Sequence, residues 1–216
     1  MSSQETRNQR QEQAAATRQK LLKSAQHLFA QNGYKGTTVR MINRSVDLAD
    51  GLLYHYFPNG KKEVFKEVIT GNMKEMFQEL QEPEKQDAYE KLPLCAALDA
   101  AYINFMAVID EHLEFIRMMM RENSVREFLS EEEIKSIWKN RIPWLPTLLQ
   151  RKMEAGEVKE MDFEMAALSV NSILMHYVMK RVTDTGRSTL DDPAWRKRLI
   201  AYQVSVWSVE HDKEQA

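Results

Sequence analysis

The stretch over residues 37–62 constrains the fold more than any other part of this 216-residue chain. Before it, apolar residues recur at helical intervals until Asn32-Gly33, where glycine can end a helix by taking a positive φ. Thr37 and Thr38 offer hydroxyls that cap a second short helix. A third short helix, from about Ala49 to Tyr54, follows a tight turn. Three short helices with such a turn before the last predict a helix-turn-helix unit, whose final helix can enter a major groove.

Residues on both sides of this turn follow a recurrent order. They are Leu21, Leu22, Ala25, Leu28, Phe29, Gly33, Tyr34, Thr37, Thr38, Ile42, Gly51, Leu53, Tyr54, His55, Tyr56, Phe57, Lys61, Lys62 and Phe65. The order resembles the amino-terminal domain of TetR-type bacterial repressors. Such repressors carry Ala-Gly, a Ser or Thr, a cation and a small polar residue where this chain has Val46-Asp47, Ala49, Asp50 and Leu52.

The resemblance implies an all-α chain with two domains. Residues 1–62 are expected to hold an amino-terminal tail and the helix-turn-helix DNA-binding domain, with a fourth helix over 62–81 as the connector. Residues 82–216 are expected to form a helical bundle that binds a ligand and dimerises. The implied function is a repressor that a small apolar or aromatic inducer releases from a near-palindromic operator.

The charge distribution supports DNA binding independently of the resemblance. Residues 1–62 carry ten lysines and arginines against four aspartates and glutamates, a net charge of +6. The remaining residues carry a net charge of −8. A basic amino-terminal segment on an otherwise acidic chain suits contact with DNA phosphates. We expect the affinity for DNA to fall as the salt concentration rises.

The candidate DNA contacts divide by chemistry. Hydroxyls and cations suit phosphate oxygens, whereas Leu52 suits a thymine methyl group and His55 a base or a phosphate. A carboxylate repels phosphates unless it accepts from a cytosine amino group or caps a helix, and of these two roles for Asp50 we favour capping of the third helix. Arg7 and Arg10 stand in a tail before Thr17 that we expect to be disordered without DNA. The predicted DNA-binding residues are Thr38, Arg40, Arg44, Asp50, Gly51, Leu52, Tyr54, His55 and Lys62.

Composition indicates a cytoplasmic protein without a membrane partner. No signal peptide opens the chain, and no apolar run approaches the length of a membrane span. The single cysteine, Cys95, excludes an internal disulfide bond and is compatible with a reducing cytosol. Its neighbours are apolar, so we expect a buried thiol.

The last two predicted helices, over about 162–183 and 193–210, each carry apolar residues on two faces. In the first, Ala166, Val170 and Leu174 lie on one face and Leu168, Met175 and Met179 on another. A helix with two apolar faces needs two partners, so one face can close the core and the other can meet a second subunit. The alternative is that both faces are buried within one chain.

An inducer site in the bundle is implied by the resemblance, and the sequence offers candidates to line it. Methionine adapts to irregular ligands, and aromatic rings suit apolar ones. The same residues at helical spacing are equally typical of a core. The predicted ligand-binding residues are Met106, Phe115, Met119, Trp138, Trp144, Asn171, Met175, His176 and Met179.

Motifs for catalysis are not found in the sequence, so we expect no enzyme, no cofactor and no metal. The five histidines are scattered, and the chain has no glycine-rich phosphate loop and no nucleophile elbow. Two alternatives to a repressor remain: a helical scaffold or binding protein whose helix-turn-helix is structural, and a helical-bundle enzyme.

Overall fold

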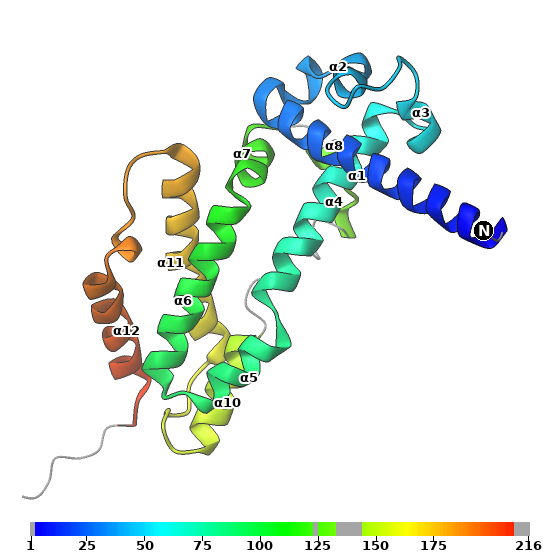
Figure 1. The fold of residues 1–216 in the computed structure, drawn as a ribbon. Helices are drawn as coiled ribbons and strands as arrows, with labels where there is room; N and C mark the ends of the chain where they lie inside the picture. The colour runs from blue at the N-terminus through cyan, green and yellow to red at the C-terminus, as the bar shows by residue number, and fades with distance from the viewer. Residues whose placement is uncertain (1–2, 123–124, 133–143, 210–216) are drawn as a thin grey trace, which may run out of the picture. The chain divides into compact units, whose positions relative to one another are not determined.

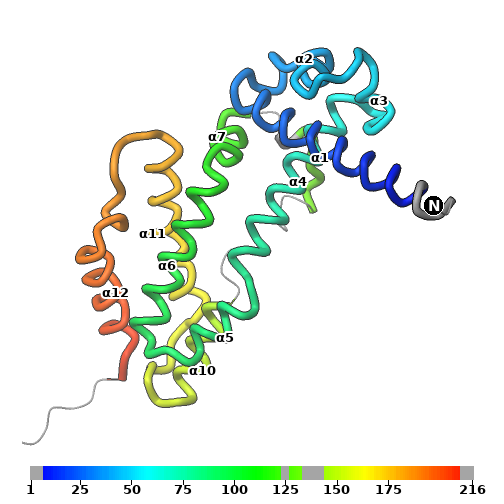
Figure 2. Tube along the Cα trace, in the orientation of Figure 1, coloured from blue at the N-terminus to red at the C-terminus, as the bar shows by residue number. Residues whose placement is uncertain are grey.

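The computed structural model describes residues 3–122, 125–132 and 144–209, and its regular elements in these ranges are helices (Figures 1 and 2). Short antiparallel pairing occurs only as an isolated bridge between Val158 and Ser208 in the described part. No described helix combines the length and the apolar composition that a membrane span requires. The helices are α1 (Ser3–Gly36), α2 (Val39–Arg44), α3 (Leu53–Tyr56), α4 (Lys61–Leu80), α5 (Pro83–Lys91), α6 (Leu94–Glu111), α7 (Leu113–Arg121), α8 (Val125–Phe128), α10 (Trp144–Glu154), α11 (Phe163–Thr183) and α12 (Pro193–Trp207), with a 3-10 turn at Thr189–Asp191.

The chain divides into two compact units. The first comprises Met1–Glu75 and Glu114–Lys135, and the second comprises Met76–Leu113 and Ser136–Ala216. Helix α4 therefore gives its first three-quarters to one unit and its last residues to the other. The assignment of DNA binding to one domain and ligand binding to the other stays a prediction.

An aromatic cluster forms the core of the first unit. The ring centroids of Phe29 and Phe65 lie 4.9 Å apart, and the planes are nearly perpendicular at 82°. Phe128 of α8 packs on Phe65 at the same centroid distance. Regular helix ends at Gly33, whose φ of 70° and ψ of 170° interrupt α1 as the sequence predicts. The cluster thus joins α1, α4 and α8.

The amino-terminal tail is helical, and the expectation of disorder was wrong. Helix α1 begins at Ser3, and residues 7–16 are exposed around the whole circumference of the helix. The reason lies in local propensity, since this segment holds three consecutive alanines together with Gln, Arg and Glu, all good helix formers.

Helix α6 lies at the centre of the second unit, packing against α5, α11 and α12. Tyr177 of α11 is fully buried and donates its hydroxyl to Asp110 at 3.0 Å. Arg196 of α12 donates to Asp99 at 2.7 Å. These pairs fix the ends of α11 and α12 to α6 through charge-assisted bonds.

The helix starts of the second unit follow local capping rules. Asp162 accepts from the backbone N–H of Met165 at 3.0 Å, and Asp192 accepts from that of Ala194 at 2.8 Å. The expectation that Cys95 is buried was wrong, because the second residue of α6 is on its exposed side.

Candidate nucleic-acid interface and candidate cavity

Asn43 holds together the turn between α2 and α3. Its backbone carbonyl accepts from Leu48 N–H at 2.9 Å, and its side-chain Oδ1 accepts from Leu53 N–H at 3.1 Å. The residue is fully buried. The start of α2 is capped by Thr38, which accepts from Met41 N–H at 3.2 Å as its position predicts. The Asn43 side chain therefore ties α2 to α3 across the turn, while Thr38 caps the opposite end of α2.

Helix α3 begins later than its sequence suggests. Gly51 has a φ of +94°, in the left-handed region, so regular helix cannot run through it, and α3 covers Leu53–Tyr56 rather than 49–54. Gly51 thus shapes the turn before α3 and lies outside the helix. No protein atom lies within 4 Å of the point where a Cβ would stand, so this side of the turn is open.

Asp50 does not cap α3, and that expectation was wrong. The cap residue of α3 is Leu52, which makes no side-chain capping bond. The Asp50 carboxylate instead pairs with Arg40 of α2, with 3.1 Å between Oδ2 and Nε. Both side chains are more than half exposed. This pair therefore lies on the open surface of the helix-turn-helix.

The remaining predicted contacts of this unit are also at the surface. Tyr54 is 53 % exposed, and its ring lies against Gly60, where an added Cβ would come within 2.8 Å of the ring carbon Cε1. The absence of a side chain at Gly60 therefore makes room for the half-exposed Tyr54 ring. The predicted residues that are exposed are Thr38, Arg40, Arg44, Asp50, Gly51, Leu52, Tyr54, His55 and Lys62.

Lys61 belongs to the recurrent order found in the sequence, and the structure gives it a structural role that was not predicted. Its ammonium group donates to the carbonyl oxygens of Tyr34 and Thr37, each at 2.8 Å, and lies 4.2 Å from the centre of the Tyr34 ring. Partial burial lowers the pKa of Lys61 below its usual range. The first residue of α4 thus ties down the end of α1, while its neighbour Lys62 stays exposed.

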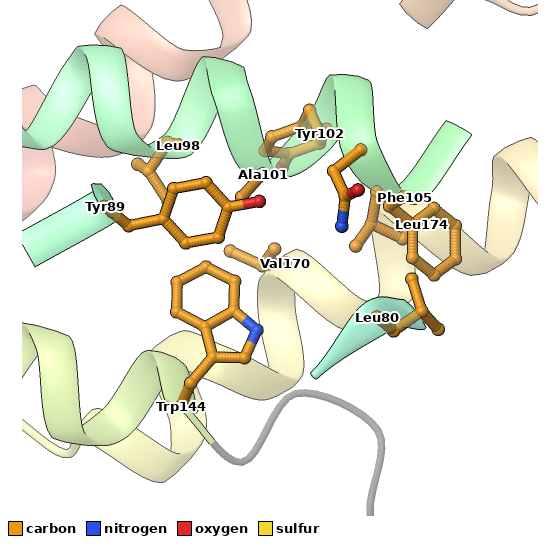
Figure 3. A pocket seen from close by; sticks show the side chains of 10 residues that line it. Leu80, Tyr89, Leu98, Ala101, Tyr102, Phe105, Trp144, Val170 and Leu174 are labelled. Carbon is orange, nitrogen blue, oxygen red and sulfur yellow. The ribbon is translucent and has the colours of Figure 1, made fainter. Parts of the chain in front are cut away.

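The second unit contains a small cavity that is partly open to solvent (Figure 3). In Figure 3 the rings of Tyr89 and Trp144 lie together on one side, with centroids 5.2 Å apart, and Phe105 and Leu174 lie on the other. No lining side chain is charged, and burial raises the pKa of Tyr89, so its hydroxyl stays protonated. The lining residues are Leu80, Tyr89, Leu98, Ala101, Tyr102, Asn104, Phe105, Trp144, Val170 and Leu174.

Trp144 is the predicted ligand residue that lines this cavity. Phe115 and Met119 belong to α7 and to the first unit. Trp138 lies outside the described residues. His176 is exposed on α11. The other predicted residues, which are half-buried in the second unit without lining this cavity, are Met106, Asn171, Met175 and Met179.

Sequence reasoning missed Tyr89 and Asn104. Tyr89 stands in α5, whose other residues are mostly charged or polar, so no apolar pattern marks it. The one available signal was a lone aromatic residue in an otherwise polar helix. Asn104 interrupts the apolar run of α6, where a polar residue calls for a partner.

The two apolar faces predicted for α11 and α12 are separate in the structure. Val170 and Leu174 are buried, whereas Leu168 is 51 % exposed on the opposite side of α11. On α12, Ile200 is buried and Tyr202 is 69 % exposed. The large apolar side chains exposed on these helices and just after them are Met165, Leu168, Trp195, Tyr202, Val206 and Val209.

Possible metal ligands are scattered over the described ranges. No three His, Cys, Asp or Glu side chains gather there as a metal site would need. Two of the buried tyrosines hydrogen-bond within the unit: Tyr102 donates to Gln203 at 3.2 Å, and Tyr177 donates to Asp110 at 3.0 Å.

Comparison with known proteins gives consistent matches. Residues 21–68 match the model of the bacterial regulatory proteins of the tetR family. The chain is 25% identical over 197 residues to the HTH-type transcriptional regulator YxaF of Bacillus subtilis, covering 88% of this chain and 94% of that protein.

Solved structures share the fold. A regulator from Mesorhizobium loti assigned to the same family superposes with a TM-score of 0.70 at 17% identity, over 91% of this chain and 98% of that one. The regulator FadR of Bacillus subtilis, in complex with stearoyl-CoA, superposes with a TM-score of 0.60 at 20% identity, over 87% and 96% of the two chains.

Proposed function

The chain is a DNA-binding transcriptional regulator of the TetR family, and we propose that it is a repressor released from a near-palindromic operator by a small apolar ligand. The observation that carries the proposal is the open surface around α3. There Tyr54, His55 and Lys62 are exposed beside a turn that Asn43 holds in place. Exposed hydroxyls and cations on a rigid turn suit phosphate contact and fix the register of α3 on DNA.

Dimerisation is proposed through the outer face of α11 and α12. That face exposes Leu168, Trp195, Tyr202 and Val206, although each helix also has a buried face. Exposed apolar groups on neighbouring helices mark a protein interface. A symmetric dimer carries two copies of α3 that read the same bases, which requires a near-palindrome.

The ligand is proposed to occupy the cavity beside Trp144. Its walls are apolar and uncharged, with the Tyr89 hydroxyl, the Asn104 amide and the Trp144 indole as polar groups. Such a lining suits an apolar or aromatic compound with one or two hydrogen-bonding groups. The fold relative that holds stearoyl-CoA supports an apolar ligand in this architecture. Because its target is DNA, we place the protein in the cytoplasm.

The decisive experiment measures fluorescence anisotropy on duplexes from the intergenic region upstream of the chain's own gene and on scrambled controls, at low and near-physiological salt. We expect tight binding to the native duplex that survives the higher salt. Lys62→Ala should weaken binding to all sequences and reduce its salt dependence, because a phosphate contact is lost. Lys74→Ala, an exposed lysine farther along α4, is the matched control.

The outcomes separate the alternatives. Equal binding to both duplexes that vanishes at higher salt would contradict an operator in that region. No binding at either salt would favour the helical scaffold or the enzyme, and the enzyme would convert a compound bound in the cavity.

The ligand site is tested with a panel of apolar compounds in a thermal shift assay. Ala101→Phe adds a ring to the cavity wall and should abolish the shift given by any compound that stabilises the wild type. Ala107→Phe adds the same ring to the exposed side of the same helix and should leave the shift intact. Equal shifts in both variants would place the ligand elsewhere.

A further inference from the structure

Arg40 and Asp50 form an ion pair on the part of the surface that would face DNA. Arg40 is the second residue of α2, and Asp50 lies in the turn just before Gly51. The side chains are 64 % and 57 % exposed, so the pair is not part of a core. An exposed pair of this kind contributes little to stability, typically below about 1 kcal/mol. Folding alone therefore gives little reason for a carboxylate at position 50.

The geometry of the pair leaves the base-reading atoms of both residues free. Asp50 Oδ2 engages Nε of Arg40, on the side of the guanidinium. The two terminal nitrogens of Arg40 remain available as a fork, and an arginine fork matches O6 and N7 of guanine. The second carboxylate oxygen of Asp50 remains available to accept from the amino group of cytosine.

The opposite charges of Arg40 and Asp50 also favour contact with a base pair over contact with a phosphate. A lone arginine at this surface is drawn to any phosphate, whatever the sequence. The neighbouring carboxylate cancels that attraction and repels phosphates itself, so the pair gains little from backbone contact. It gains from a partner with both acceptor and donor groups, which a G·C base pair presents in the major groove.

We propose that Arg40 and Asp50 act together as one reader of a G·C base pair, in which Asp50 orients Arg40 and selects against other pairs. The inference rests on the proposed DNA-binding function. It gives Asp50 the role of a specificity-determining residue, and it explains a carboxylate on a surface that otherwise suits anions.

The test begins with selection of duplexes from a randomised DNA library by the wild-type protein. Dissociation constants are then measured on the selected sequence with each base pair of a half-site replaced in turn. We expect one position at which G·C is preferred about tenfold or more, the discrimination that a bidentate contact gives.

Asp50→Asn is the diagnostic variant, because it keeps the shape and removes the charge. We expect the G·C preference at that position to fall to about twofold, while affinity for random DNA rises and its salt dependence steepens. Asp47→Asn is the matched control. It removes one negative charge from the same turn, and asparagine tolerates the φ of 56° found at Asp47. It should leave the base preference at every position unchanged.

A second comparison tests whether the two residues act as a unit. Arg40→Ala should remove the G·C preference, and adding Asp50→Asn to it should change that preference no further. The proposal is overturned if Asp50→Asn and Asp47→Asn alter affinity alike with all base preferences intact, or if the effects of the two substitutions add. If the wild type enriches no sequence from the library, the regulator function itself fails, which is a different result from an enriched sequence that ignores Asp50.

Discussion

At Asn43 one buried side chain links α2 and α3 of the first unit, so its removal should be costly. Asn43→Ala leaves the N–H of Leu53 without its acceptor in a buried setting. We expect the free energy of unfolding to fall by about 1–3 kcal/mol, measured by urea denaturation. Asn32→Ala, an exposed residue of α1, is the control. A loss at Asn43 no larger than that at Asn32 would show that the turn does not depend on this bond.

Replacement of Gly60 tests whether the position of the Tyr54 ring matters for DNA binding. A methyl group there meets the Tyr54 ring at 2.8 Å, and the φ of +63° is itself unfavourable for alanine. Gly156→Ala carries a comparable strain at a φ of +76° with open space around its Cβ. Both variants should lose about 1 kcal/mol of stability from strain. Gly60→Ala alone should also weaken DNA binding, because the tyrosine must move; equal DNA affinity in both variants would contradict this role for Tyr54.

At the scale of the helices, Tyr102 of α6 gives the contact with α12 a measurable pH dependence. Burial raises the pKa of Tyr102 from 10.0 to about 12. The folded chain therefore keeps a proton that the unfolded chain loses as the pH passes 10, and the unfolding free energy falls between about pH 10 and pH 12. Tyr102→Phe should show a shallower fall in urea denaturation across this range. Tyr202→Phe, on the exposed side of α12, serves as the control and should follow the wild type.

Helices were predictable where the signal is local. The cap at Thr38 was predicted, and it involves a bond to a residue only three positions away; the caps at Asp162 and Asp192 are equally local. The start of α3 was misplaced because the left-handed Gly51 blocks a helix that its neighbours would tolerate. The partner of Asp50 was missed because Arg40 lies ten positions earlier on another helix.

The cavity in the second unit was less predictable, because its lining depends on contacts between residues far apart in the sequence. The cavity collects side chains from α4, α5, α6, α10 and α11, and which of them meet depends on packing between helices. Apolar periodicity placed Val170 and Leu174 on the buried face of α11 and Leu168 on an exposed face, since it reports the direction of each side chain on its own helix. Met175 and Met179, predicted to share the face of Leu168, are half-buried. It does not report whether a buried methionine or tyrosine borders a cavity or a filled core.

At the scale of the whole molecule, the outer face of α11 and α12 predicts the oligomeric state. Tyr202→Glu combined with Val206→Glu places two charges on that face, and we expect sedimentation velocity to show monomers where the wild type shows dimers. Lys197→Glu changes the charge of an exposed polar position on the same helix and should leave the dimer intact. A monomeric wild type, or a doubly substituted dimer, would exclude this face as the interface.

The exposed apolar face also bears on how steeply the protein responds to its own abundance. When the chain is scarcer than the dissociation constant of the dimer, the amount of dimer rises with the square of the amount of chain. Doubling the synthesis of the chain would then quadruple the concentration of the dimer that can bind both half-sites of an operator. A cell carrying such a protein would see an abrupt onset of control over a narrow range of expression, and the apolarity of Tyr202 and Val206 would set where that onset falls.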